Sequence, residues 1–553
     1  MKKHADSIYV SSAIFTGNSL ESMNGAIAIA GDRIIAVGSM DSMTEYINSN
    51  TKIIDCGDKL IAPGFNDSHV HFMYGAVLAD EDFCLALHDC KSEEECVQKV
   101  KEFADAHPHN PWIFGSGWNE NIWPGGKSPD RRSLDELFPD RPVYLSSWDI
   151  HSAWVNKKAL ELIGYDRNTP DLEDGFIDHF PDGEPSGLLR EPGVCDPVQK
   201  LVMQTANFKD SIDKYMKIAA KHGVTSLGNV HPYGGIEEKE ALEIYKKLED
   251  DGIITSRIHL FAELKKDLTG VKEYEKEYCS KKLRFAGLKK ITDGLCESHT
   301  GYLLEPYADD PTTKGELQVK PEELKELIIN ADREGYSVRL HCIGDGAVRN
   351  ALDCFEAAQQ VNGKKGINHA IEHIENCHID DVPRFAKLGV MASMQPMHLI
   401  MNIDGYPAFV GEKRLKTTWP MRSLIDAGTR ITFGTDFPVV SLNPMEGIYA
   451  AITRQTFDGY PEGGFVPNQC ITLGEALQSY TYGSALVANY GNELGTLSVG
   501  KLADIVVLDK NLFTATPKEI LETKVLMTMV GGEVVYSDPD NSLLGLNKIL
   551  SIF

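Results

Sequence analysis

The sequence predicts an α/β fold: a (β/α)8 TIM-like barrel, a small β-sandwich domain built from both chain ends, and a large insertion after the first barrel strand. Three observations predict it. Eight short apolar runs lie along the middle of the chain, helix-like stretches join most of them, and both ends are rich in β signals. Eight strands that alternate with helices can close into a parallel barrel.

The two chain ends carry similar hairpin signals. "GAIAIAGDRIIAVG" places two apolar runs around a Gly-Asp turn, and "VLMTMVGGEVVYS" repeats the arrangement around Gly531 and Gly532. Turn residues between strand-like runs are a strong hairpin signal. We therefore expect one discontinuous β domain over residues 1–61 and 490–553, which leaves residues 62–489 for the barrel.

The predicted barrel strands are short and apolar. In chain order they are "LIAPGFNDSHVHF", "GVTSLGNV", "SRIHLFAEL", "LRFAGLKKITDG", "YSVRLHCIGD", "NHAIEHIE", "GVMASMQPMH" and "TRITFGTDFPV". The first two are separated by a long segment rich in Trp, Pro and Gly. A structureless loop of that length is uncommon in a compact domain, so we expect an inserted subdomain at about residues 76–205.

Composition narrows the class of protein. Hydrophobic residues make up 42% of the 553 residues and charged residues 25%, as in ordinary globular proteins. The formal net charge of −26 argues against a nucleic-acid partner, because phosphate binding needs clustered Lys and Arg. With no signal-peptide core, no long apolar run and scattered cysteines, we expect a cytoplasmic protein with reduced thiols, no membrane partner and a small-molecule substrate.

Side chains that can bind a metal ion lie late in five of the predicted strands. They are His69 and His71 in the first, Lys289 and Asp293 in the fourth, His341 in the fifth, His373 in the sixth and Asp436 in the eighth. The carboxyl ends of barrel strands meet at one mouth, so we expect these residues to converge. Four imidazoles and a carboxylate suit zinc or a similar divalent ion.

Each of these residues also has an ordinary structural interpretation. A His-x-His pair alone is a weak motif. An isolated His341 or His373 is often a hydrogen-bonded core histidine, Asp436 can cap the following helix, and Lys289 can pair with an acidic neighbour. The metal interpretation is favoured because all of them fall at strand ends together.

Several longer motifs carry a resemblance to a known family. They are "APGFNDSHVHF", "GLKKITDG", "HCIGDGAV", "GTDFPV", "GTLSVGKLADIVVLD" and, in the insertion, "GWNENIWPGGKSPDRRSLDELFPDRPVYLSSWDIHSAWVNKKAL". With them the chain resembles the amidohydrolase superfamily, in the YtcJ-like branch that includes N-substituted formamide deformylase. The resemblance covers nearly the whole length and implies a metal-dependent hydrolase.

The resemblance implies a role for each candidate ligand. One ion would be bound by His69, His71 and Asp436, a second by His341 and His373, and Lys289 would be carboxylated on its amine to bridge them. One or two divalent ions per chain are therefore expected, with zinc the first choice. The adjacent Lys290 is the rival bridge, but the two lysines point to opposite strand faces and the family register favours Lys289.

The implied reaction is hydrolysis of a non-peptide C–N bond in an amide, an N-substituted formamide or a cyclic amide. Asp436 would accept a proton from metal-activated water and pass it to the leaving amine. Two alternatives remain open: a deaminase with a mononuclear site, and a non-catalytic scaffold. The scaffold interpretation predicts lost ligands, whereas every ligand position is filled here.

Substrate contacts are expected from the insertion and the seventh strand. Five of the six tryptophans lie in the insertion, and most of them are expected to hold that subdomain together. Trp118 and Trp148 adjoin the family-like motifs and are expected in the substrate wall, with His151 and Gln395 as polar contacts. Gly346 and Ile150 depart from the family's usual Arg and Gly, and "CESHTG" departs from its Gly-Ser-Arg-Thr. These departures bear on substrate choice. A homodimer is a further expectation.

Overall fold

The computed structural model describes residues 4–148, 152–171, 175–231 and 236–540. The chain forms two compact units, which are treated separately below. The first comprises Met1–Val70, Met216–His231 and Ile254–Phe553, and the second comprises His71–Tyr215 and Pro232–Ile253.

An eight-stranded parallel sheet forms the barrel of the first unit, in the order β19-β18-β17-β16-β15-β14-β13-β6. A parallel bridge between Val70 and Phe437 links its two edges. Its strands are β6 (Phe65–Val70), β13 (Val224–Val230), β14 (Arg257–Glu263), β15 (Leu283–Ile291), β16 (Val338–Cys342), β17 (Ala370–His373), β18 (Met391–Met394) and β19 (Ile431–Phe433). Each lies within one of the eight predicted runs, so the predicted fold class is confirmed.

Most residues of these strands are buried, because helices cover the outer face of such a barrel. Every residue of β6, β13 and β18 is buried. The helices of this region are α8 (Thr269–Glu277), α9 (Pro321–Glu334), α10 (Asp345–Asn362), α11 (Val382–Leu388), α12 (His398–Met401), α13 (Tyr406–Val410), α14 (Glu412–Leu415), α15 (Met421–Asp426), α16 (Pro444–Thr453), α17 (Leu473–Gln478), α18 (Ser484–Val487) and α19 (Pro517–Leu521).

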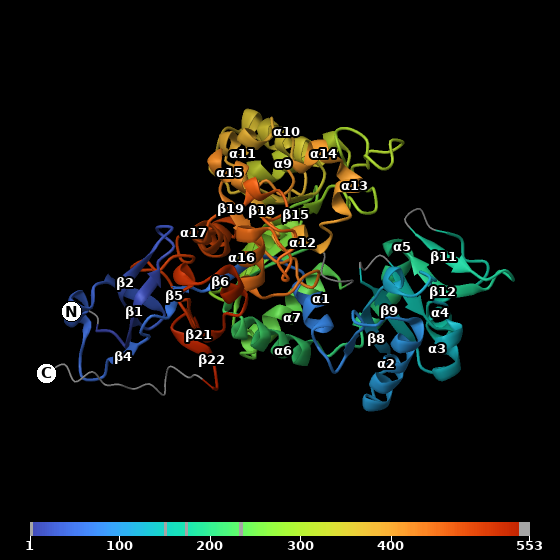
Figure 1. Ribbon diagram of the computed structural model, residues 1–553, viewed down its shortest axis with the longest axis horizontal. Coiled ribbons are helices and arrows are strands. Elements are labelled where there is room, and N and C mark those ends of the chain that lie inside the picture. Colours follow the sequence, from blue (N-terminus) through green and yellow to red (C-terminus); the bar gives the residue numbers. More distant parts are fainter. Residues whose placement is uncertain (1–3, 149–151, 172–174, 232–235, 541–553) are drawn as a thin grey trace. The chain divides into compact units, whose positions relative to one another are not determined.

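Strands from both chain ends pair in a second sheet of the first unit, where blue and red strands lie together (Figure 1). Its strands are β1 (Ser7–Phe15), β2 (Ser22–Ala30), β3 (Arg33–Gly38), β4 (Lys52–Asp55), β5 (Leu60–Pro63), β20 (Ile505–Leu508), β21 (Val525–Val530) and β22 (Glu533–Ser537). β1 pairs with β4 through Ser7–Val10 and with β5 through Ala13 and Ile14, so the sheet branches there. Both branches contribute to one apolar cluster that includes Ile27 and Ile505.

The second unit contains a six-stranded sheet in the order β11-β12-β10-β9-β8-β7. Its strands are β7 (Cys84–Ala86), β8 (Ile113–Trp118), β9 (Val143–Ser147), β10 (Ser152–Val155), β11 (Phe176–His179) and β12 (Pro185–Arg190). Its helices are α1 (Phe72–Leu78), α2 (Glu93–Ala106), α3 (Arg132–Leu137), α4 (Lys157–Ile163), α5 (Pro192–Met203) and α7 (Glu238–Asp250), while α6 (Phe208–Lys221) runs across the boundary between the units.

Tryptophans form the centre of this second unit. Trp118, Trp123 and Trp154 belong to one buried cluster. Each indole N–H donates to a backbone carbonyl: Trp118 to Leu145 at 2.8 Å, Trp123 to Cys90 at 3.2 Å and Trp154 to Asp130 at 3.0 Å. These bonds satisfy the polar atom that a buried indole carries.

The cysteines and the helices bear on the expectations of reduced thiols and of no membrane partner. All eleven cysteines are free thiols, as expected. Within the described ranges, no helix has both the length and the apolar character needed to cross a bilayer.

Candidate metal centre

The predicted ligands come together where the barrel strands end. His69 lies on β6, Lys289 on β15, and His341 on β16. His373 is the last residue of β17, and Asp436 follows β19 in the next loop. His71 lies one residue beyond β6, immediately before α1.

Three groups of side chains, made up of predicted ligands together with Glu372 and His398, have donor atoms within 4.8 Å of one another. They are His69, His71 and Asp436; His69, Glu372 and His373; and His373, His398 and Asp436. The ring centroid of His341 is 4.3 Å from that of His373, which places His341 beside the second and third groups. Asp436 and His373 each belong to two of the groups, so the three groups are contiguous.

Hydrogen bonds fix the loop after β19 against the end of β6. The Asp67 carboxylate accepts from the backbone N–H of Thr435 at 2.9 Å and from its hydroxyl at 2.5 Å. The Asp436 N–H donates to the His69 carbonyl at 2.7 Å. Burial raises the pKa of Asp67 to about 7. The outcome is that His69 Nε2 lies 3.2 Å from Asp436 Oδ1.

Two of the candidate ligands have an unusual backbone conformation. The φ angles of His373 and Asp436 are 70° and 59°, in the left-handed region that L-residues with side chains seldom adopt. Such conformations cluster at functional sites, because the surrounding structure must hold them there. His373 adopts this conformation as the last residue of β17, and Asp436 adopts it in the loop after β19.

The environment of His69 determines which ring nitrogen is available. Its Nδ1 lies 3.0 Å from Glu372 Oε1 and 3.3 Å from Gln395 Nε2, whereas Nε2 faces Asp436. A carboxylate behind a histidine fixes the ring and leaves the opposite nitrogen for a metal. Burial lowers the pKa of His69 and of His373 well below 6.5. Both rings are therefore neutral, which is the form that binds a metal.

Lys289, and not Lys290, reaches this group. Lys289 is buried and its amine contacts Glu372, whose Oε1 lies 2.5 Å from Arg339 Nη2. Burial and the Arg339 charge lower the pKa of Lys289 well below 10.5. Lys290 instead pairs with Glu263 at 3.1 Å.

Asp293 anchors the loop that follows β16. Its carboxylate accepts from the backbone N–H groups of Tyr302, Ile343 and Gly344 at 2.9–3.0 Å. Its Oδ1 lies 3.8 Å from His341 Nε2, and burial raises the pKa of Asp293 to about 7. Asp293 therefore holds His341 in place through the backbone.

The donor set fits a divalent ion. Neutral imidazoles and carboxylates are standard ligands of zinc and related metals. Both ring nitrogens of His373 are buried, and among the residues that the structure describes neither has a hydrogen-bond partner. A buried polar atom without a partner is costly, and coordination to an ion would satisfy one of them.

The four predicted substrate contacts lie in different surroundings. Gln395 is fully buried against His69. Trp118 is fully buried in the core of the second unit, and Trp148, in the same unit, is 42% exposed. His151 lies outside the described residues. Of these four, the structure brings Gln395 to the metal ligands.

The sequence interpretation missed three residues of the site. Glu372 and Arg339 form its buried ion pair. His398 Nε2 lies 3.9 Å from Asp436 Oδ2. A signal for His398 was present, because the seventh apolar run, "GVMASMQPMH", ends in that histidine just as other runs end in ligands.

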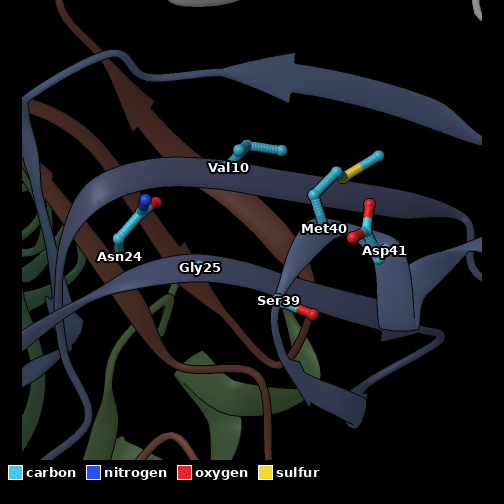
Figure 2. A pocket seen from close by; sticks show the side chains of 6 residues that line it. All are labelled: Val10, Asn24, Gly25, Ser39, Met40 and Asp41. Carbon is cyan, nitrogen blue, oxygen red and sulfur yellow. The ribbon is translucent and has the colours of Figure 1, made fainter.

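A surface pocket lies elsewhere in the first unit, on the sheet formed by the chain ends. It is lined by Val10, Asn24, Gly25, Ser39, Met40 and Asp41 (Figure 2). None of the candidate ligands lines it, so it is separate from the metal centre.

The model of the amidohydrolase family matches residues 52–536. Similar proteins include "Protein LONG AFTER FAR-RED 3" of Arabidopsis thaliana, 30% identical, with 96% of this chain and 92% of that protein covered. "Putative amidohydrolase YtcJ" of Bacillus subtilis is 28% identical, with 92% and 96% covered. "N-substituted formamide deformylase" of Arthrobacter pascens is 24% identical, with 97% and 99% covered.

A solved structure shows the same likeness. The crystal structure of an uncharacterized metal-dependent hydrolase from Pyrococcus horikoshii superposes with a TM-score of 0.76 at 27% identity. The match covers 92% of this chain and 99% of that one. The resemblance expected from the motifs is thereby confirmed.

Proposed function

Because the chain belongs to the amidohydrolase family, whose model matches most of its length, we propose that its substrate is a small amide, N-substituted formamide or cyclic amide. The protein is a metal-dependent hydrolase of carbon–nitrogen bonds other than peptide bonds. The observation that carries the proposal is the convergence of neutral histidines on the Asp436 carboxylate. The name of the formamide deformylase relative supports the substrate class.

The ligands divide between two ion positions in this proposal. His69, His71 and Asp436 hold one ion, and His341 and His373 contribute to the other. Zinc is the proposed metal, since imidazole and carboxylate suit it. Lys289 lies among these residues with a lowered amine pKa, and a neutral amine is the form that takes up carbon dioxide. We therefore propose carboxylated Lys289 as a bridging ligand.

The bound ion would polarise the substrate carbonyl and acidify water, which is the chemistry that amide hydrolysis needs at neutral pH. In this proposal Asp436 carries the proton from the attacking water to the leaving nitrogen. Its carboxylate accepts a proton from the attacking water and then gives it to the leaving nitrogen. Glu372 keeps the His69 ring oriented from behind, at 3.0 Å from Nδ1.

A substrate panel tests this function. The zinc-loaded protein is incubated with N-alkyl and N-aryl formamides, linear amides, cyclic amides and aminopurines. We expect release of an amine and a carboxylate from at least one amide class, loss of that activity with a chelator, and recovery on adding zinc. Ammonia release from the aminopurines alone would contradict the proposal and assign the protein to deamination.

A further inference from the structure

We propose that His398 is a metal ligand, which with His373 and Asp436 forms the second ion position. Asp436 lies between the two positions, with Oδ1 toward His69 and Oδ2 toward His373 and His398. This inference rests on the proposed metal-dependent function and adds a ligand from α12, after the seventh barrel strand, to those expected from the sequence.

The two oxygens of Asp436 face different histidines. Oδ1 lies 3.2 Å from His69 Nε2. Oδ2 lies 4.0 Å from His373 Nδ1 and 3.9 Å from His398 Nε2. Ligand atoms about 2.1 Å from a tetrahedral ion are about 3.4 Å apart, so these gaps are close to the separation that an ion imposes. One carboxylate therefore serves two adjacent donor groups.

The burial and orientation of the His398 ring are those expected of a metal ligand. Its Nε2 is buried and, within the described chain, has no hydrogen-bond partner. The ring is nearly parallel to that of His373, with an interplanar angle of 15°. A buried ring nitrogen without a partner, beside a carboxylate, is explained by a shared ion.

The Glu375 side chain lies near the other ring nitrogen of His398. Glu375 Oε1 is 4.0 Å from His398 Nδ1, a longer distance than the 3.0 Å between Glu372 and His69. The other oxygen of Glu375 accepts from the Tyr406 hydroxyl at 3.1 Å, and Tyr406 in turn accepts from the Asn376 amide at 2.7 Å. This chain of bonds fixes the Glu375 side chain beside the ring.

The two glutamates beside these histidines come from one segment. In "EHIE", Glu372 precedes His373 and Glu375 follows it by two residues. Glu372 lies 3.0 Å from His69 Nδ1, and Glu375 lies 4.0 Å from His398 Nδ1. The segment after β18 also contributes two residues. Gln395 lies 3.3 Å from His69, and His398 is the first residue of α12. The same two segments therefore serve both ion positions.

Cobalt titration of the metal-free protein tests the assignment without an activity assay. We expect two cobalt equivalents to bind to the wild type, each changing the visible spectrum. In His398→Gln the first equivalent binds as before, and the second binds at least about tenfold more weakly. In His398→Cys a thiolate replaces the imidazole, and a sulfur-to-cobalt charge-transfer band in the near ultraviolet shows direct coordination.

His259→Gln is the matched control. His259 is buried, and in the described residues both its ring nitrogens lack hydrogen-bond partners. It packs against Tyr490, and burial, together with the charges of Arg257, Arg284 and Arg339, lowers its pKa to about 3. We expect its cobalt titration to match that of the wild type.

Two results would overturn the inference. If His398→Gln binds both equivalents with the wild-type spectrum and His398→Cys shows no charge-transfer band, His398 is not a ligand. That result leaves the proposed function standing, because the wild type still binds metal. If the wild type itself binds no cobalt, the inference and the proposed function both fail. The cysteine variant keeps the test decisive if the glutamine variant is unstable.

Discussion

Replacing Asp436 by Asn is expected to lower kcat by about 10²–10⁴-fold, the usual contribution of a positioned acid–base group. The amide cannot accept the proton that the attacking water must lose. The substitution is otherwise mild, since Asn tolerates the left-handed conformation at φ 59° and keeps the N–H bond to His69. The measurement is kcat on the best substrate of the panel, with metal content determined on the same samples.

Asp380→Asn is the control for Asp436. Its carboxylate is 80% exposed and lies near His378 in the loop after β17. We expect unchanged kcat in this variant. If Asp436→Asn retained the ion at His69 and His71 and also turned over at the wild-type rate, Asp436 would have no part in proton transfer.

Replacing Glu372 by Gln is expected to lower the free energy of unfolding by about 3–5 kcal/mol, the cost of removing one partner from a buried ion pair. Glu372 and Arg339 are fully buried. Arg339 also donates to the Ser68 carbonyl at 2.6 Å and to the Ser393 hydroxyl at 2.9 Å, so its position is fixed. Without the carboxylate, the Arg339 guanidinium is left in the barrel without its ion-pair partner. The measurement is the urea unfolding midpoint of the metal-free protein.

Glu322→Gln provides the comparison for Glu372. The Glu322 side chain is 83% exposed and pairs with Lys325 on the surface of α9. Exposed pairs contribute about 0–1 kcal/mol, so a small shift of the midpoint is expected. Equal shifts for the two variants would show that the buried pair does not stabilise the barrel.

The barrel could be predicted from sequence because its strands lie in eight short runs rich in apolar residues, most of them joined by helix-like stretches. β18, for example, is mostly apolar and is buried throughout. The sequence predicted less well the residue at which each strand ends. "HVH" was expected to lie on one strand, yet β6 ends at Val70 and His71 precedes α1.

The convergence of the candidate metal ligands could be predicted because the carboxyl ends of barrel strands meet, whatever their separation in sequence. The charged residues that surround the candidate ligands could not be predicted in this way. Glu372 and Arg339 are charged and fully buried, and only the folded chain shows that each is the other's partner. Trp118, which was expected in the substrate wall, is fully buried in a cluster of the second unit, and its contact with substrate stays a prediction.

The most direct test of the central claim is the metal content of the protein. Elemental analysis is made on protein purified without chelator and with bicarbonate present. The account predicts about two divalent ions per chain, held by the histidines and Asp436. No bound ion, even after zinc is added back, would contradict the account and leave the converging histidines without their proposed role.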